Sequence, residues 1–65
     1  MLIQLQGEKR QTQASTVMDL LKELNLLPSQ VAVEHNGSVV FRHELASTRL
    51  KENDRIEIVR VAAGG

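Results

Sequence analysis

Few residues of this 65-residue chain could carry chemistry, and most of them lack the partners that chemistry needs. His35 and His43 have no cysteine and no set of carboxylates at metal-ligand spacing, whereas a structural zinc site needs several close ligands. Ser38 matches no nucleophile motif, and serine is common in turns. No glycine-rich loop precedes a helix to bind the phosphates of ATP. Without cysteine there is also no thiol and no disulfide. We therefore expect a chain that is not an enzyme and binds no metal or cofactor by itself.

The last residues, Val61-Ala62-Ala63-Gly64-Gly65, end on a carboxylate that could itself be the working group. This carboxylate is ionised at neutral pH and is a poor electrophile until a partner enzyme adenylates it. Attack on the adenylate by a sulfur species would give a thiocarboxylate, and attack by a lysine amine would give an isopeptide bond. Both routes require the chain end to enter a narrow site on another protein.

Small residues suit such a route, because glycine has no side chain to clash and adopts backbone conformations closed to other residues. Four extended residues reach about 13–14 Å, so Ala62, Ala63 and Gly64 would thread into a partner and place Gly65 in its active site. Since cysteine is absent, any sulfur that the chain carries must be attached to the Gly65 carboxylate. The alternative is that these small residues have no role, as at many chain ends.

Composition narrows the choice of partners. Eight basic and eight acidic residues cancel, so the chain lacks the positive charge that binds nucleic acids and anionic membranes. Phe41 is the only aromatic residue, which leaves no stacking surface for single-stranded nucleic acid. No apolar run approaches the roughly 20 residues of a membrane span, and the first residues lack a signal-peptide pattern. We expect a monomeric, cytoplasmic protein with no nucleic-acid or membrane partner.

The first half of the chain predicts two strands and a helix. Residues 1–6 alternate between apolar and polar, and the charged residues 9–14 suit an edge strand of the same hairpin. Thr16 is the expected N-cap of a helix with one apolar stripe, formed by Val17, Leu20, Leu21 and Leu24. We expect this helix to end near Asn25 and Leu26-Leu27 to be buried under the next loop, while its Glu and Lys residues face solvent.

The second half predicts a hairpin and a final strand. Asn36-Gly37 between the apolar runs 31–35 and 38–41 is typical of a type I′ turn, which needs positive φ at both residues. A short helical turn is expected in residues 42–48. The remaining expectations are Leu45 and Leu50 in the core, a turn at 52–54 and a strand at 55–61.

This element order predicts an α+β fold of the β-grasp, ubiquitin-like type. A mixed sheet of four to five strands would pack on one main helix, with the two terminal strands parallel at the centre. The single domain would comprise residues 1–61, followed by a flexible C-terminal tail at 62–65.

The last strand breaks the alternation. Ile56 and Ile58 share one face, and Val59 and Val61 share the other, so both faces are apolar just before the tail. If the helix covers Ile56 and Ile58, then Val59 and Val61 face outward and, extended by Phe41, form a docking surface for a partner. The alternative is that a loop or a bulge covers them.

The whole chain resembles the ThiS family, the sulfur carrier proteins of thiamine biosynthesis, which have the ubiquitin-like β-grasp fold. The resemblance rests on the short length and on four segments: Thr16-Val17 with Leu20-Leu21, residues 31–40, residues 53–59, and the terminal Gly64-Gly65. It implies that a ThiF-like enzyme uses ATP to adenylate Gly65. It also implies a thiocarboxylate on Gly65, with sulfur from a cysteine desulfurase, that thiazole synthase consumes.

Three departures from the family's pattern accompany the resemblance. Asn53 stands where glycine is frequent, but asparagine also tolerates positive φ, so the turn should survive. Phe41-Arg42 replaces a frequent Pro-Arg, and Ala62-Ala63 precedes the glycines where one residue is often glycine. Other hypotheses remain open: a MoaD-type carrier for molybdopterin synthesis, a protein modifier conjugated to lysines, or an interaction module with an inert tail.

Overall fold

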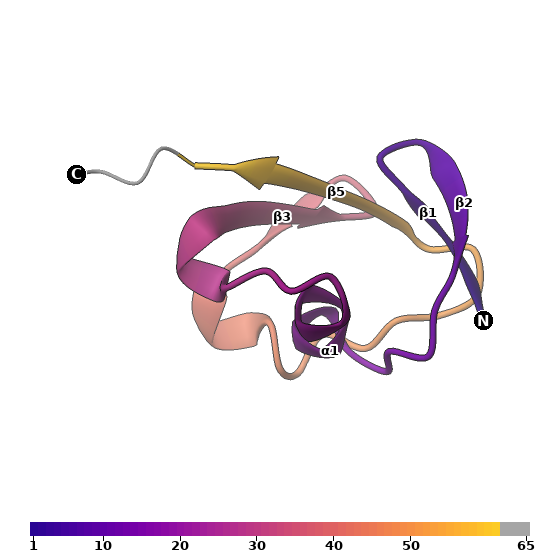
Figure 1. Cartoon of the computed structure of the whole chain (residues 1–65), viewed down its shortest axis with the longest axis horizontal. Coiled ribbons are helices and arrows are strands. Elements are labelled where there is room, and N and C mark those ends of the chain that lie inside the picture. The colour runs from indigo at the N-terminus through magenta and orange to yellow at the C-terminus, as the bar shows by residue number, and fades with distance from the viewer. Residues whose placement is uncertain (62–65) are drawn as a thin grey trace.

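Alternating apolar residues near both ends of the sequence form neighbouring strands of one mixed five-stranded sheet (Figure 1). The computed structural model describes residues 1–61. The sheet order is β2-β1-β5-β3-β4, with β1 and β5 parallel and all other neighbours antiparallel. The elements are β1 (Leu2–Leu5), β2 (Glu8–Gln11), α1 (Val17–Glu23), η1 (Pro28–Gln30), β3 (Val31–His35), β4 (Ser38–Val40), η2 (Arg42–Glu44) and β5 (Arg55–Arg60). The predicted β-grasp fold is confirmed, with β2 at an edge as expected.

Helix α1 lies against one face of the sheet (Figure 1) because one side of it is apolar, and caps at its two ends define its length. The Thr16 hydroxyl accepts the Asp19 N–H at 3.1 Å, which confirms Thr16 as the N-cap. At the other end Asn25 has a φ of 60°. The Leu26 N–H donates to the Leu21 carbonyl at 2.8 Å, as in a Schellman motif. These contacts confirm that the helix ends just before Asn25.

The core lies between α1 and the covered face of the sheet. Its fully buried large side chains come from the helix stripe and the two parallel strands: Ile3, Val17, Leu20, Leu21 and Ile56. Leu45 and Leu50 are also buried, as predicted, at 3% and 6% exposure. Truncating one of the large core residues to alanine should cost about 2–5 kcal/mol. That is a large share of the total stability of a domain this small.

The hairpin of β3 and β4 follows its prediction closely. Asn36 and Gly37 have φ of 52° and 87°, as a type I′ turn requires. The register pairs Val33 with Val40 and Glu34 with Val39. Val33 and Val40 therefore face the helix, while Glu34 and Val39 lie on the outer face of the sheet.

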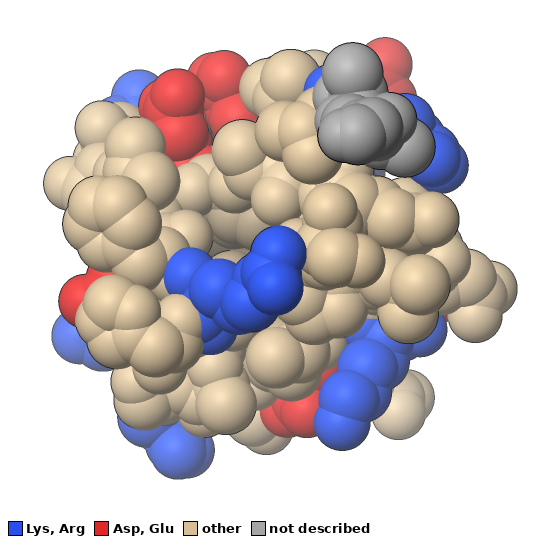
Figure 2. All heavy atoms as spheres, turned by 90° about the vertical axis from the view of Figure 1, so that its left-hand side faces the viewer, with Lys and Arg blue, Asp and Glu red and all other residues tan. Residues whose placement is uncertain are grey.

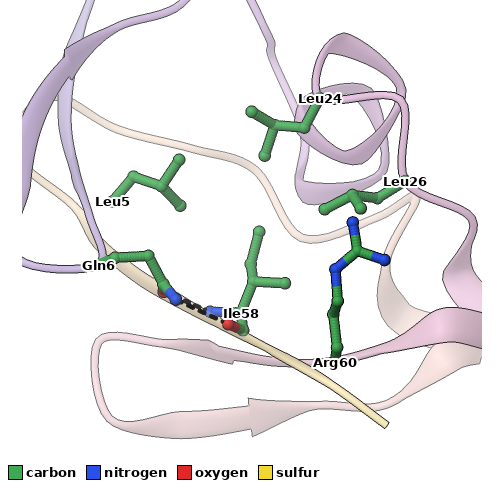
Figure 3. A pocket seen from close by; sticks show the side chains of 6 residues that line it. All are labelled: Leu5, Gln6, Leu24, Leu26, Ile58 and Arg60. Atoms are coloured by element: carbon green, nitrogen blue, oxygen red, sulfur yellow. Dashed lines mark hydrogen bonds between the residues drawn. The ribbon is translucent and has the colours of Figure 1, made fainter. Parts of the chain in front are cut away.

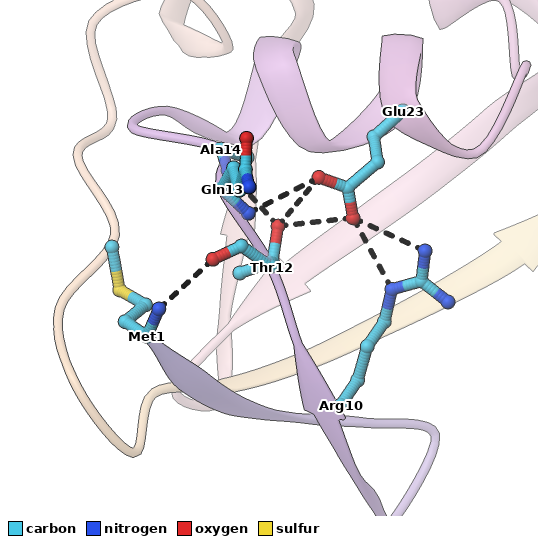
Figure 4. A network of polar contacts seen from close by, with 6 residues as sticks. All are labelled: Met1, Arg10, Thr12, Gln13, Ala14 and Glu23. Carbon is cyan, nitrogen blue, oxygen red and sulfur yellow. Dashed lines mark hydrogen bonds and ion pairs between the residues drawn. The ribbon is translucent and has the colours of Figure 1, made fainter.

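Glu23 ties the end of α1 to the segment that follows β2 (Figure 4). Its carboxylate accepts the Thr12 hydroxyl at 2.8 Å and the Arg10 guanidinium at 3.1 Å. The Gln13 N–H donates to the same carboxylate at 3.3 Å. The Thr12 bond, with smaller contributions from Arg10 and Gln13, holds the pKa of Glu23 below its ordinary value against the effect of burial. Glu23 is exposed, as expected for the charged residues of the helix, but its carboxylate also joins two segments, which the sequence did not predict.

The end of β2 and the burial of Leu27 differ from the predictions. β2 ends at Gln11 instead of residue 14, because Thr12 turns inward to bond Glu23 and also accepts the Ala14 N–H at 3.0 Å. The prediction that Leu27 is buried is wrong: its exposure is 60%, because it precedes η1 and lies outside the helix–sheet interface. Leu26 is half-buried. In the part of the chain that the structure describes, no helix combines the length and the hydropathy that crossing a bilayer requires.

Candidate functional site

Strand β5 leads directly into the residues that the sequence marks as functional. It ends at Arg60, and the Val61 N–H then donates to the Gln30 carbonyl at 2.9 Å, which holds the backbone against β3 up to that point. The predicted attachment residue Gly65 and the threading residues Ala62, Ala63 and Gly64 lie outside the described residues. The predicted flexible tail and the domain boundary after residue 61 likewise remain predictions.

The two faces of β5 differ in burial, as the alternation predicts. Ile56 is completely buried under α1 and Ile58 is half-buried. Val59 and Val61 are 59% and 44% exposed on the opposite side. Neither a bulge nor a loop covers them within the described chain, so the prediction that both face outward is confirmed. Their role in docking remains a prediction.

An apolar patch runs across the outer face of the sheet beside the end of β5. Val59 pairs with Ala32 on β3, and Phe41 directly follows Val40, which pairs with Val33 on the other side of β3. Phe41 is 60% exposed and stacks its ring on that of His43, with centroids 6.2 Å apart. We call Val59, Val61, Ala32, Val39 and Phe41 the outer patch. Figure 2 shows the end of the molecule where β5 finishes, and its surface is mostly uncharged, with acidic and basic residues scattered among the uncharged ones.

His35, one of the two histidines in the sequence, is part of a polar cluster. His35 Nε2 lies 2.7 Å from Asp54 Oδ2, and the Asn36 amide donates to Asp54 Oδ1 at 3.1 Å. The Lys51 N–H donates to Asp54 at 2.9 Å. Burial raises the pKa of Asp54, but the bonds from His35, Asn36 and Lys51 outweigh it and hold that pKa below its ordinary value.

This cluster joins the β3–β4 turn to the turn before β5, so its role is structural. The sequence does not reveal the carboxylate beside His35, because Asp54 is distant in sequence and only the fold brings it close. Within residues 1–61, no three His, Cys, Asp or Glu side chains are grouped so that they could hold a metal ion. Asn53, which begins the same turn region, has a φ of 70°, so this departure from the family's glycine is accommodated.

A second surface near the end of β5 lies on the helix side and was not expected from the sequence. An open groove of about 450 Å³ is lined by Leu5, Gln6, Leu24, Leu26, Ile58 and Arg60. Figure 3 shows Leu5, Leu24 and Ile58 pointing into it, with the Arg60 side chain extending from β5 toward Leu26. One signal was available in the sequence: residue 60 continues the inward parity of Ile56 and Ile58, so an arginine stands at a helix-facing position.

Polar groups inside the domain are all paired. Among the described residues, every buried side-chain nitrogen and oxygen has a hydrogen-bond partner. The groove is open to solvent. The described part of the chain therefore has two exposed surfaces near the end of β5, the groove on the helix side of the sheet and the outer patch on the other.

Comparisons with known proteins agree with this fold and size. The model of the ThiS family matches residues 2–65. A crystal structure of the thiamine biosynthesis protein ThiS from Geobacter metallireducens is similar, with a TM-score of 0.85 and 28% identity over 100% of both chains. A solution structure of a thiamine biosynthesis protein from the same organism has a TM-score of 0.79 and 28% identity, over 100% of this chain and 88% of the other. No curated protein matches the sequence. Because the family model spans nearly the whole chain and the fold agrees along its full length, the chain belongs to the ThiS family of small carrier proteins.

Proposed function

We propose that this protein is a sulfur carrier of thiamine biosynthesis whose working group is the Gly65 carboxylate. The observation that carries the proposal is the match of the family model through residue 65, together with a similar fold in a thiamine biosynthesis protein. In the proposed cycle a ThiF-like enzyme joins the carboxylate to the AMP moiety of ATP and releases pyrophosphate. A desulfurase draws sulfur from cysteine as a persulfide, whose terminal sulfur displaces AMP and forms an acyl disulfide. A thiol such as free cysteine then reduces the S–S bond and releases the thiocarboxylate. Thiazole synthase takes that sulfur and regenerates the carboxylate.

The geometry supports a role as the co-substrate of other enzymes. Val59 and Val61 leave an apolar surface beside the start of residues 62–65, and Phe41 extends it across β3 and β4. Burying such a patch against a partner is favourable by about 25 cal/mol per Å² of apolar surface. The folded domain would dock outside the partner's active site, while Ala62, Ala63 and Gly64 carry Gly65 inward. We place the protein in the cytoplasm, as a monomer between partners.

The test uses the full chain, a ThiF-like enzyme, ATP and a cysteine desulfurase with cysteine. The expected product has an intact mass changed by one oxygen-to-sulfur exchange at Gly65. Deleting Gly65, or adding one bulky residue after it, should abolish adenylation and leave the unfolding midpoint unchanged. Mass increases from conjugation to lysines would instead support the modifier hypothesis, and transfer of sulfur to a pterin would support the MoaD-type hypothesis. Absence of any adenylate with the unaltered chain would contradict the proposal.

A further inference from the structure

Strand β5 continues beyond the end of its neighbour β1. The parallel ladder joins only Gln4 to Arg55 and Leu5 to Ile56. The Gln6 side chain then takes over: its amide donates to the Ile58 carbonyl at 2.8 Å and accepts the Ile58 N–H at 2.7 Å. Gln6 and Gly7 have positive φ of 54° and 82°, so β1 turns away at this point. The side of β5 that faces β1 is therefore covered only up to Ile58.

The main chain of Arg60 faces this uncovered side. In an antiparallel pair, successive residues direct their N–H and C=O groups alternately toward and away from the partner strand. The Val61 N–H bonds the Gln30 carbonyl, and the Asn36 N–H bonds the Arg55 carbonyl, so the odd-numbered residues of β5 face β3. Arg60 lies opposite Val31 and is even-numbered, so it faces away from β3. Within residues 1–61, β1 has no backbone level with it.

The helix-side groove lies beside the same uncovered edge of β5, since Ile58 and Arg60 line it. Leu5, Leu24, Leu26 and Ile58 form its apolar walls, and none of the described residues that line it is acidic. Arg60 makes no ion pair with any described residue. An open strand edge, an apolar depression and an arginine without an acidic partner thus occur together, directly before residues 62–65.

We propose that an extended segment of the adenylating partner enzyme adds to this edge as a further strand. Main-chain groups of the segment would bond the Arg60 N–H and C=O, as in other cases of strand addition. Side chains two residues apart in a strand point to the same face. The segment would therefore carry an apolar residue for the groove and, two residues away, an acidic residue for Arg60. This inference rests on the proposed function, and its effect is to fix the backbone immediately before the carboxylate-bearing residues.

The experiment measures ATP–pyrophosphate exchange by a ThiF-like enzyme as a function of the concentration of the full chain. Arg60→Glu should raise the KM for the carrier roughly tenfold with little change in kcat, because it reverses a charge in the docked surface and leaves Gly65 intact. Arg60→Lys should recover most of the affinity. Arg55→Glu is the matched control: the same charge reversal on the same strand, at an exposed residue of the other face, should change KM less than twofold.

Amide hydrogen exchange gives a readout specific to strand addition. The Arg60 N–H should exchange at least about tenfold more slowly in the complex than in the free chain, as a newly formed backbone bond requires. The inference would be overturned, and the proposed function left standing, by either of two results. One is an unchanged KM in ATP–pyrophosphate exchange with Arg60→Glu, and the other is an Arg60 N–H whose hydrogen exchange is as fast in the complex as in the free chain. Failure of the unaltered chain to be adenylated would contradict the proposed function, and the inference with it. An Arg60 N–H already slow in the free chain would also overturn the inference. If hydrogen exchange of the Arg60 N–H in the free chain is slow at every protein concentration, the chain itself occupies the open edge of β5. If this exchange slows as the protein concentration rises, a second copy of the chain occupies that edge.

Discussion

Gln6 and Ile58, which are 52 residues apart in sequence, are joined by two hydrogen bonds between the side-chain amide of Gln6 and the backbone of Ile58. The Gln6 side chain thus replaces the backbone hydrogen bonds that β1 cannot make to β5 after it turns away. Because β5 is the strand that leads to the residues proposed to be functional, this amide determines how far its backbone is held on the β1 side.

We predict that Gln6→Ala lowers the free energy of unfolding by about 1–2 kcal/mol, since two hydrogen bonds of about 0.5–1.5 kcal/mol each are lost at a partly solvated site. The Ile58 N–H should also exchange faster with solvent. Chemical denaturation and amide exchange measure the two effects. Gln4→Ala is the control, because Gln4 is equally exposed and β1 keeps its ladder without that side chain. Equal effects of the two substitutions would contradict the assignment.

The Asp54 cluster predicts a loss of stability in acid. The pKa of Asp54 is below its ordinary value of 3.8 in the folded protein, so the carboxylate contributes stability above pH 3.8 that is lost as the pH falls through the folded pKa. The pKa of Glu23 is likewise below its ordinary value of 4.5, so its carboxylate also contributes stability that is lost in acid. Asp54→Asn should cost about 1–3 kcal/mol at pH 7, because its amide nitrogen cannot accept the bonds from His35 and the Lys51 N–H.

The measurement is the urea midpoint between pH 7 and pH 2.5 for both proteins. The difference between wild type and Asp54→Asn should shrink at the acid end of the series. A constant difference across the series would show that the carboxylate's charge is not what the cluster uses.

Asn53 tests the turn before β5. Its φ of 70° lies in the left-handed region, where a β-branched residue is strained by roughly 1–2 kcal/mol. Asn53→Val should lower the free energy of unfolding, measured by urea denaturation, by that amount, whereas Asn53→Gly should leave it nearly unchanged. Lys51→Val, at an exposed residue without positive φ, controls for the change in composition. Equal losses for the valine variants at positions 51 and 53 would contradict a strain specific to Asn53.

Val59 tests the outer patch. Because Val59 is 59% exposed, Val59→Asp should leave the domain folded and raise the KM for the carrier in ATP–pyrophosphate exchange about tenfold. Leu2→Asp makes the same kind of change on the same sheet face, at the start of β1 and away from the patch, and should have little effect on KM. An unfolded Val59→Asp variant would show that Val59 is not a free surface residue. An unchanged KM would exclude the patch from docking.

Much of the fold could be predicted from the sequence because its determinants are local. The Thr16 cap, the Asn36-Gly37 turn and the parity of Ile56 against Val59 each depend on a few neighbouring residues, and the structure confirms all three. The family resemblance then agreed with a strand order that element order alone already favoured.

The rest depends on contacts between distant segments, which periodicity does not encode. Asp54 is buried against His35 and Asn36, which belong to the β3–β4 hairpin. Glu23 accepts a hydrogen bond from Thr12, which lies just after the end of β2. Leu27 is apolar but lies on a loop outside the interface, so hydrophobicity alone misplaced it. Arg60 could have been found from its inward parity, but the groove beside it exists only because β1 stops short.

The position of β5 has a consequence for synthesis. The β1–β2 and β3–β4 hairpins have no strand contact with each other, and β5, which follows both of them in the chain, is the strand that joins them. Contacts across such a long separation form late, after loop closure has been overcome. A nascent chain must therefore expose β5 before the sheet can close. Translation products truncated before β5 lack the joining strand, so they would have neither the closed sheet nor the surfaces on its two faces.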